Sequence, residues 1–301
     1  MTGRWAPSPT GHFHLGNLRT ALLAWLFTRS ASESLIWRFE DLDNAVRPEF
    51  YRSQIRDFQR IGLDWDGEPV RQSSRVGIYR DAIGQLTSQG LTYRCWCSRR
   101  EIREAISAPH AHLPEGAYPG TCRDLTRQQI SRHEASGREP ALRLSTQGEV
   151  VKIQDRQLGN FEGAVDDFVL CRGDGVPSYN LGVVVDDADL GITEVVRGAD
   201  LLPSTPRQVH LFGLLGLNPP SYAHVPLVVA PSGERLAKRH GAVTIEDRLA
   251  LGESELDVLN ILLSSLHIEK VASFRELSER VKNFDSTSLP LTPWTFTDRV
   301  P

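Results

Sequence analysis

Apolar residues in the first third of the chain repeat at two different spacings. Leu18, Leu22 and Leu26 recur at every fourth position, which places them on one face of a helix. Residues 34–40 alternate instead, so every second side chain shares one side of a strand. Residues 4–6 are a short strand candidate that ends at the prolines which follow. The chain is therefore expected to begin strand, helix, strand.

Two more helices are predicted downstream. Residues 48–61 fit the first, and Val76, Tyr79, Ile83 and Leu86 form an apolar stripe on the second. Strands that alternate with helices in this way are typical of a parallel, doubly wound sheet. The pattern predicts the α/β class.

The middle of the chain does not follow this alternation. Residues 92–176 contain a cysteine-bearing loop rich in proline and glycine, then short alternating segments such as residues 141–144. The alternation resumes with a buried-strand pattern at residues 181–185, a helix around residues 206–215 and a strand at residues 225–229. The simplest interpretation is a nucleotide-binding fold that an inserted domain interrupts.

The end of the chain is more helical. Leu256, Leu259, Leu263 and Leu266 share one helical face, and prolines follow at 290 and 293. Together these patterns predict four segments. They are the first half of the nucleotide-binding fold at residues 1–91, the insertion at 92–178, the second half of the fold at 179–245 and a helical segment at 246–301.

Composition narrows the choice of partners. The chain has 301 residues, 40% of them hydrophobic, so it can bury a sizeable core. Its formal net charge of −4 argues against a surface that attracts nucleic acid as a whole. RNA contact would depend on short basic groups such as residues 99–103 or 235–239, and a solvated face is the alternative for each. The N-terminus lacks a signal peptide and the longest apolar run, residues 21–27, is too short to cross a membrane, so a cytoplasmic protein with no membrane partner is expected.

Residues 7–17 join the first strand candidate to the first helix. In a parallel sheet such a loop lies in the crevice at the carboxyl ends of the strands. A helix N-terminus offers backbone donors to phosphate, and Gly16 allows a close approach. His12 and His14 add donors that can stabilise the charge of a departing pyrophosphate. The segment predicts a phosphate site, with a surface turn or a metal pair as the alternative for the two histidines.

A second candidate segment, residues 233–241, is a basic loop bounded by glycines. A mobile Lys238 in this loop can reach phosphates and neutralise charge in the transition state. Taken alone, the segment is typical of an ordinary solvated loop. It gains weight as the distant partner of residues 7–17.

The cysteines suggest a metal. Three of the four gather within residues 95–122, namely Cys95, Cys97 and Cys122. Structural zinc sites have four ligands, and the residues between the cysteines offer His110, His112 and Tyr118 as the fourth, histidine being the commoner donor. Three unrelated reduced cysteines are the alternative, and Cys171 is expected in the core.

The two phosphate-site segments resemble the signature motifs of class I aminoacyl-tRNA synthetases. HLGN at residues 14–17 corresponds to the HIGH motif, and RLAKR at residues 235–239 corresponds to KMSKS. Four further segments resemble the glutamyl branch: residues 4–11 (RWAPSPTG), 38–43 (RFEDLD), 179–181 (YNL) and 196–200 (VRGAD). The resemblance spans about residues 4–245. It implies a Rossmann-like catalytic domain that uses ATP with Mg²⁺ and activates L-glutamate as its adenylate.

The resemblance also implies roles for individual residues. His14 and Lys238 are expected in catalysis. The residues expected to bind ATP are His12, His14, Gly16, Asn17, Arg235 and Lys238. Those expected to bind glutamate are Arg4, Ala6, Pro7, Ser8, Glu40, Tyr179 and Arg197. This inventory of cationic forks, an acid and a hydroxyl suits a substrate with two carboxylates and an ammonium group.

Some residues near these motifs have other interpretations. Arg235 stands where KMSKS has lysine and Ala237 where it has serine, so a working but slower activation step is expected. An ion pair on one strand face is the alternative for Arg38 and Glu40. Loop and cap roles are favoured over magnesium binding for a set of four aspartates, Asp41, Asp43, Asp186 and Asp187.

The cysteine spacing resembles a short family within this branch, the glutamyl-queuosine tRNA(Asp) synthetases. In that family Cys-x-Cys is followed by Tyr-x-x-x-Cys and tyrosine is the fourth zinc ligand. The resemblance implies one structural Zn²⁺ per chain, held by Cys95, Cys97, Tyr118 and Cys122. It implies a monomer that transfers glutamate to queuosine in the anticodon of tRNA(Asp). The alternatives are a truncated glutamyl-tRNA synthetase that charges the 3′ end of tRNA(Glu), a small-molecule nucleotidyltransferase and a non-catalytic zinc-bearing RNA-binding module.

Overall fold

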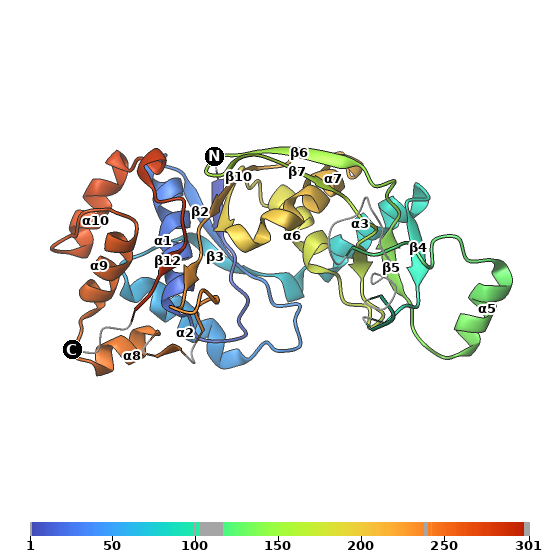
Figure 1. Cartoon of the computed structure of the whole chain (residues 1–301), viewed down its shortest axis with the longest axis horizontal. Helices are drawn as coiled ribbons and strands as arrows, with labels where there is room; N and C mark the ends of the chain where they lie inside the picture. Colours follow the sequence, from blue (N-terminus) through green and yellow to red (C-terminus); the bar gives the residue numbers. More distant parts are fainter. Residues whose placement is uncertain (1, 99, 103–116, 238–239, 242, 298–301) are drawn as a thin grey trace.

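A parallel five-stranded sheet, in strand order β10-β9-β1-β2-β3, lies at the centre of the molecule (Figure 1). The computed structural model describes residues 2–98, 100–102, 117–237, 240–241 and 243–297. The strands of the sheet are β1 (Thr2–Trp5), β2 (Ser34–Phe39), β3 (Asp66–Arg71), β9 (Glu194–Gly198) and β10 (Ser221–Val225). All their pairings are parallel, so the predicted α/β class with a parallel sheet is confirmed.

Helices cover both faces of this sheet. They are α1 (Leu15–Ser30), α2 (Pro48–Arg60), α6 (Tyr179–Asp189) and α7 (Thr205–Leu214), while α3 (Val76–Ser88) packs against α6. Leu35, Trp37 and Phe39 alternate along β2 and pack into the main core with α1 and α2. On the opposite face Val195 and Tyr222 pack with Val209 of α7. The sheet is therefore buried on both sides, as parallel sheets usually are.

β1 and β9 are neighbouring strands from which the chain leaves in opposite directions. Helix α1 leads from β1 toward β2, whereas α7 leads from β9 toward β10. Loops diverge at such a switch point and leave a crevice beyond the carboxyl ends of the strands. Gly3 brings α1 close to β1, because a Cβ added there would lie 2.1 Å from Oγ1 of Thr28. The crevice is thus a consequence of strand order.

Two of the predicted strands are wrong. Residues 181–185 form part of α6, in which Ser178 caps the helix by accepting a hydrogen bond from the Leu181 amide. This helix is buried along residues 181–187, and a short apolar run looks the same in a buried helix as in a buried strand. Residues 225–229 are divided between β10 and β11 (Val228–Val229), because Pro226 between them has no amide to continue the ladder.

The segment after residue 91 extends away from the sheet (Figure 1). Its antiparallel strands, in order β4-β5-β8, are β4 (Thr92–Cys95), β5 (Ala141–Leu144) and β8 (Val169–Cys171), with α5 (Arg127–Ala135) outside them. A hairpin of β6 (Val150–Asp155) and β7 (Gly159–Ala164) returns to the sheet, where the amide of Arg156 donates to the carbonyl of Tyr222 over 2.8 Å. Phe168 and Phe212, which lie on opposite sides of the predicted boundary at residue 178, share a second core. The predicted division at residues 92 and 178 stays a prediction.

The last part of the described chain packs on α1. It contains α8 (Ile245–Ala250), α9 (Glu255–Ser265), α10 (Phe274–Arg280) and β12 (Trp294–Thr295), which pairs in parallel with β11. Buried Arg19 of α1 donates to the Pro226 carbonyl over 2.7 Å and to Oγ of Ser265 over 3.0 Å. This side chain links α1, α9 and the loop between β10 and β11. Among the described residues, no helix has both the length and the apolar character to cross a membrane.

Candidate active site

The residues predicted to bind ATP and glutamate meet in one cleft. It has a volume of about 490 Å³ and is formed by β1, the loop to α1, β9, the start of α6 and the loop after β11. The predicted residues that line it are Arg4, Ala6, Pro7, Ser8, His12, His14, Gly16, Asn17, Glu40, Tyr179, Arg197 and Arg235. Lys238 lies outside the described residues, so its roles stay predictions.

His14 is the N-cap of α1 and takes part in a reciprocal capping box. Its Nδ1 accepts from the amide of Asn17 over 3.3 Å, and Oδ1 of Asn17 accepts from the amide of His14 over 3.1 Å. Because Nδ1 is an acceptor, the proton of the neutral ring is on Nε2. Burial, with a further contribution from Arg235, lowers the pKa of His14 to about 4. At neutral pH His14 is therefore an uncharged N–H donor.

Gly16 has no side chain, and this leaves space for the His14 ring. A Cβ added at Gly16 would lie 2.8 Å from Cε1 and 2.9 Å from Nδ1 of that ring. Helix α2 holds the loop that precedes it, because Nε2 of Gln54 donates to the carbonyls of Ser8 over 3.0 Å and Gly11 over 2.8 Å. The loop therefore keeps its shape through contacts with both neighbouring helices.

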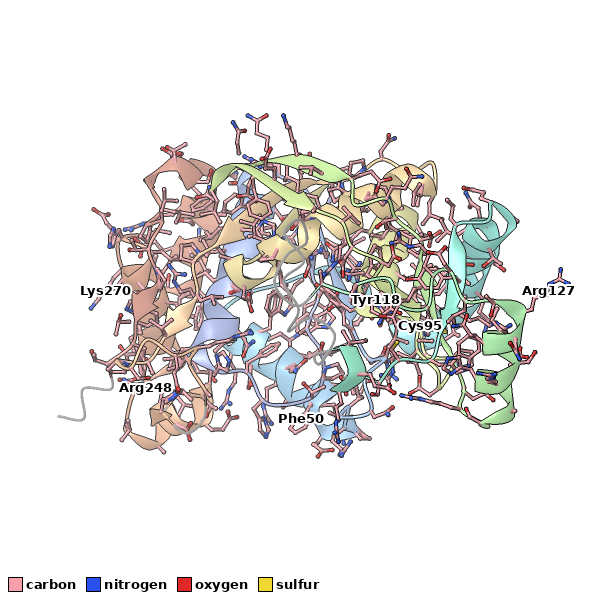
Figure 2. All side chains as sticks on the ribbon, turned by 45° about the vertical axis from the view of Figure 1, so that its right-hand side comes forward. Phe50, Cys95, Tyr118, Arg127, Arg248 and Lys270 are labelled. Atoms are coloured by element: carbon pink, nitrogen blue, oxygen red, sulfur yellow. The ribbon has the colours of Figure 1, made fainter. Side chains whose placement is uncertain are left out.

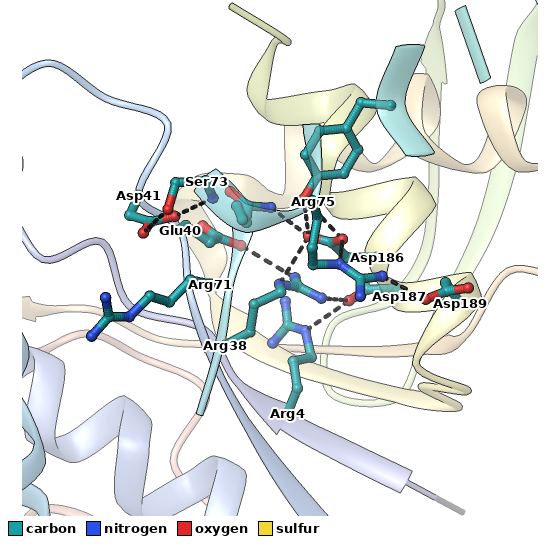
Figure 3. Close-up of polar contacts among 12 residues, drawn as sticks. Arg4, Arg38, Glu40, Asp41, Arg71, Ser73, Arg75, Asp186, Asp187 and Asp189 are labelled. Atoms are coloured by element: carbon teal, nitrogen blue, oxygen red, sulfur yellow. Dashed lines mark hydrogen bonds and ion pairs between the residues drawn. The ribbon is translucent and has the colours of Figure 1, made fainter. Parts of the chain in front are cut away.

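Arginines and acids form a buried network beneath the cleft (Figure 3). Arg38 donates from Nη1 to Asp187 over 2.5 Å and from Nη2 to Glu40 over 3.2 Å. Arg4 lies with Nε 3.6 Å from Asp187 and donates from Nη1 to the Val196 carbonyl over 3.3 Å. Burial raises the pKa of Glu40, although Arg38 and Arg4 act in the opposite direction. The predicted ion pair of Arg38 and Glu40 is present, and Glu40 also faces the cleft.

Asp186 and Asp187 of α6 are buried and bind other side chains of the core, which their sequence positions did not suggest. Asp186 accepts from the hydroxyl of Tyr79 over 2.9 Å and from Nε2 of Gln72 over 2.7 Å, and it is fully buried. Asp186 and Asp187 are therefore core ion-pair residues, and the loop or cap role predicted for them is wrong. Asp43 does have a loop role, since its carboxylate accepts from the amide of Ala45 over 2.7 Å.

Arg197 enters the cleft from β9, and two of its three guanidinium nitrogens already donate hydrogen bonds. Nε donates to Nε2 of His224 over 3.0 Å and Nη2 donates to Oγ1 of Thr205 over 2.8 Å. Nδ1 of His224 in turn lies 2.6 Å from a carboxylate oxygen of Asp155. Within the described part of the chain, Nη1 of Arg197 is buried and has no hydrogen-bond partner. A donor is thus left for a ligand in the cleft.

The loop after β11 closes the opposite side of the cleft. Leu236 donates its amide to the Val228 carbonyl over 3.0 Å, so the loop folds back along β11. Arg235 projects from this turn and Nη1 donates to Asp200 over 2.8 Å. The amide of Ala237 is satisfied by Nδ1 of His240 over 2.9 Å. The arginine that replaces the usual lysine therefore connects this loop to the segment after β9.

The cysteine cluster lies in the segment after residue 91, where Figure 2 labels Cys95 and Tyr118, and none of its residues lines the cleft. The sulfur atoms of Cys95, Cys97 and Cys122 all lie within 4.8 Å of one another. The hydroxyl of Tyr118 lies 3.3 Å from the sulfur of Cys95 and 3.6 Å from that of Cys97. The histidines at positions 110 and 112, the other candidates for a fourth ligand, lie outside the described residues. Three sulfurs and one oxygen therefore converge on one point.

Comparison with known proteins gives these motifs a family. Residues 1–300 match the family described as tRNA synthetases class I (E and Q), catalytic domain. The chain is 53% identical over 296 residues to the Glutamyl-Q tRNA(Asp) synthetase of Nocardia farcinica. The matched residues cover 98% of this chain and 93% of that protein. The chain belongs to the glutamyl-Q tRNA(Asp) synthetase branch of the class I tRNA synthetases.

More distant members of the class I synthetases are also similar to the chain. Glutamate--tRNA ligase 1 of Alkalilimnicola ehrlichii is 41% identical over 266 residues, which are 86% of this chain and 55% of that protein. The glutamate-tRNA synthetase structure from Elizabethkingia anophelis has the same fold, with a TM-score of 0.82 at 24% identity over 99% of this chain and 68% of that chain. The chain therefore has the Rossmann-like class I catalytic fold.

Sequence reasoning missed part of this synthetase's site. His224 contacts Arg197 and Asp155 contacts His224 in turn, yet neither residue lies in a recognised motif. A histidine within an apolar strand was the only available signal, because β10 otherwise reads as a buried strand. Nothing in the sequence links it to an aspartate 69 positions earlier.

Proposed function

We propose that the chain forms glutamyl adenylate from L-glutamate and ATP and transfers the glutamyl group to queuosine in the anticodon of tRNA(Asp). One observation carries the first half of this proposal. Two arginines, a glutamate and the neutral N–H donor of His14 line a single cleft at the switch point of a parallel sheet. Such a crevice is where open α/β folds bind nucleotides.

The amino-acid end of the cleft suits glutamate. Nη1 of Arg197 offers a buried donor to a carboxylate, and Arg4 adds a second positive charge near it. Glu40 provides the negative partner that an ammonium group requires. Tyr179, at the first turn of α6, adds a hydroxyl at the rim of the cleft. A glutamine side chain would leave one cationic donor without its charge partner, so the acid is favoured.

The nucleotide end of the cleft suits adenylate formation. A carboxylate oxygen of glutamate attacks the α-phosphorus of ATP, the bond to the bridging oxygen breaks, and pyrophosphate leaves with the electron pair. Nε2 of His14 donates to the phosphate oxygens that gain charge, and Lys238 is proposed to follow the departing pyrophosphate. No protein nucleophile is needed, since orientation and charge stabilisation supply the rate. Mg²⁺ bound with ATP would neutralise part of the phosphate charge.

The cysteine cluster is proposed as a structural zinc site. Three sulfurs within 4.8 Å of one another and the Tyr118 hydroxyl supply four donors, the number that structural Zn²⁺ takes. Cys95 ends β4 and Cys122 follows Tyr118 by four positions. A shared ion there would fix the two ends of the intervening loop together.

The acceptor is inferred from the relatives. The chain is more similar to the Nocardia glutamyl-Q tRNA(Asp) synthetase than to the Alkalilimnicola glutamate--tRNA ligase, at 53% against 41% identity. Similarity to the second protein keeps charging of tRNA(Glu) as the alternative function. Both functions share the same adenylate chemistry, so the acceptor distinguishes them.

One experiment tests both halves. The protein is given ATP and labelled glutamate, first without RNA to follow pyrophosphate exchange. It is then given tRNA(Asp) with queuosine, tRNA(Asp) without queuosine, or tRNA(Glu). Exchange without RNA, and label only on the queuosine-containing tRNA, are expected. Label on tRNA(Glu), or exchange that strictly requires tRNA, would favour the alternative. Absence of glutamate-dependent exchange both with and without tRNA would exclude glutamate activation.

A further inference from the structure

The β6–β7 hairpin carries an acid to the back of the amino-acid pocket. Asp155, the last residue of β6, is buried and accepts from the backbone amide of His224 over 3.1 Å. It also accepts from the amides of Gln157 and Leu158 over 3.0 and 2.9 Å. The carboxylate is therefore held by three backbone donors before the His224 side chain is considered, and its orientation is fixed.

This acid determines which nitrogen of His224 carries the proton. A carboxylate only accepts hydrogen bonds, so Nδ1 of His224, 2.6 Å away, must be the donor. Burial lowers the pKa of His224, and although Asp155 acts against this, the imidazole stays neutral. Nε2 therefore keeps its lone pair, and that lone pair accepts from Nε of Arg197 over 3.0 Å. The fully buried imidazole is a fixed acceptor for one specific donor of Arg197.

Arg197 is held at a second point by α7. Nη2 donates to Oγ1 of Thr205 over 2.8 Å, and Thr205 is also fully buried. Two contacts on different nitrogens of a planar group fix both its position and its rotation. Nη1 is left over, and it belongs to a side chain that lines the cleft. The free donor therefore has one orientation.

We propose that His224 and Asp155 are positioning residues of the amino-acid pocket, which hold Arg197 in the orientation that binds a carboxylate of the substrate. The assignment rests on the proposed glutamate activation. Neither Asp155 nor His224 is among the residues that line the cleft. The β6–β7 hairpin, which lies between β5 and β8 in the chain, would therefore support the pocket through Arg197.

The test uses two substitutions of His224 in the full chain. In His224→Leu no acceptor remains for Nε of Arg197, whereas the amide oxygen of His224→Gln can occupy the place of Nε2. Steady-state pyrophosphate exchange should give a KM for glutamate about tenfold higher in His224→Leu, with the KM for ATP nearly unchanged. His224→Gln should recover most of the loss. Lys152→Ala, on the exposed side of the same hairpin, is the matched control and should behave as wild type.

A double substitution separates positioning from a general packing effect. If His224 acts through Arg197, His224→Leu should add nothing to the KM of an Arg197→Ala variant. Equal KM values for His224→Leu and wild type, or additive effects in the Arg197→Ala background, would overturn the assignment. If His224→Leu does not fold, as judged by thermal unfolding, Thr205→Val removes the other acceptor of Arg197 and must raise the same KM. Wild-type protein that shows no exchange either with or without tRNA would instead refute glutamate activation itself.

Discussion

Arg38 on β2 and Asp187 on α6 form an ion pair of 2.5 Å in which neither side chain is more than 1% exposed. Nε of Arg4, on the neighbouring strand, lies 3.6 Å from the same carboxylate oxygen. One acid thus holds two arginines that come from adjacent strands of the sheet. Because Arg4 also lines the cleft, the packing of α6 on the sheet and the shape of the site depend on each other.

Asp187→Asn should destabilise the fold. It keeps the side-chain volume but leaves two buried arginines short of one negative charge, and breaking a buried pair from one side typically costs about 3–5 kcal/mol. Urea unfolding measures the change. Glu279→Gln is the control, because its pair with Arg275 is solvent-exposed and should be worth about 0.5 kcal/mol or less. Equal losses in the two variants would contradict a structural role for Asp187.

The stability of the protein should depend on the titration of His14. Its folded pKa of about 4 lies below the usual 6.5 because of burial and Arg235. Between these values the unfolded chain binds a proton that the folded chain does not, so stability falls as pH falls from 6.5 to 4. A shift of this size corresponds to about 3 kcal/mol. His14→Asn keeps an N-cap side chain but cannot titrate. The free energy of unfolding of wild type, relative to that of this variant, should therefore decrease as pH falls from 6.5 to 4. Parallel curves would show that His14 titrates normally.

Lys238→Ala should slow adenylate formation far more than it weakens glutamate binding. The lysine is proposed to act on pyrophosphate in the transition state, so kcat for exchange should fall by a hundredfold or more, about 2.7 kcal/mol, with little change in the KM for glutamate. Lys152→Ala provides a lysine control on the exposed face of β6. Unchanged turnover in Lys238→Ala would remove the lysine from the mechanism.

Purified protein should contain about one zinc per chain, measured by elemental analysis. Cys97→Ser should lose the metal, because a hydroxyl is a weak replacement for a thiolate ligand. Cys171→Ser is the matched control, since Cys171 lies in β8 outside the cluster and should retain the metal. Tyr118→Phe tests the fourth position, and full zinc content in that variant would point to the histidines at positions 110 and 112. A folded, metal-free wild-type protein would refute the zinc site.

Some of the site could be predicted because short-range chemistry defines it. The loop before α1 is such a case, since His14 caps the helix with a partner three residues later. The cysteines were predicted as a cluster for a similar reason, and the structure brings their sulfurs together. The glutamate pocket needed more than local rules, because Arg4 and Arg197 lie on two different strands and Glu40 directly follows a third. Their meeting was inferred from resemblance to a family.

Other features could not be predicted from the sequence. Residues 181–185 read as a strand, yet they form part of a helix that is buried in the second core. Burial on all sides removes the polar face that makes a helix recognisable by its period. In the same way Asp186 and Asp187 resembled loop acids, although the charge of Arg38 on β2 and a hydrogen bond from Tyr79 on α3 to Asp186 allow them to be buried.

The sequence alone determined the alternation of strands and helices, the phosphate-type loop and the grouping of the cysteines, because each depends on residues close together in the chain. Only the tertiary structure decided the partners of Arg38 and Arg197. Asp187 lies 149 positions after Arg38, and Asp155 lies 69 positions before His224. Contacts over such separations follow from strand order and from the return of the β6–β7 hairpin to the sheet. A buried charge needs its partner at hydrogen-bond distance, and it is the packing of distant elements that brings the partner there.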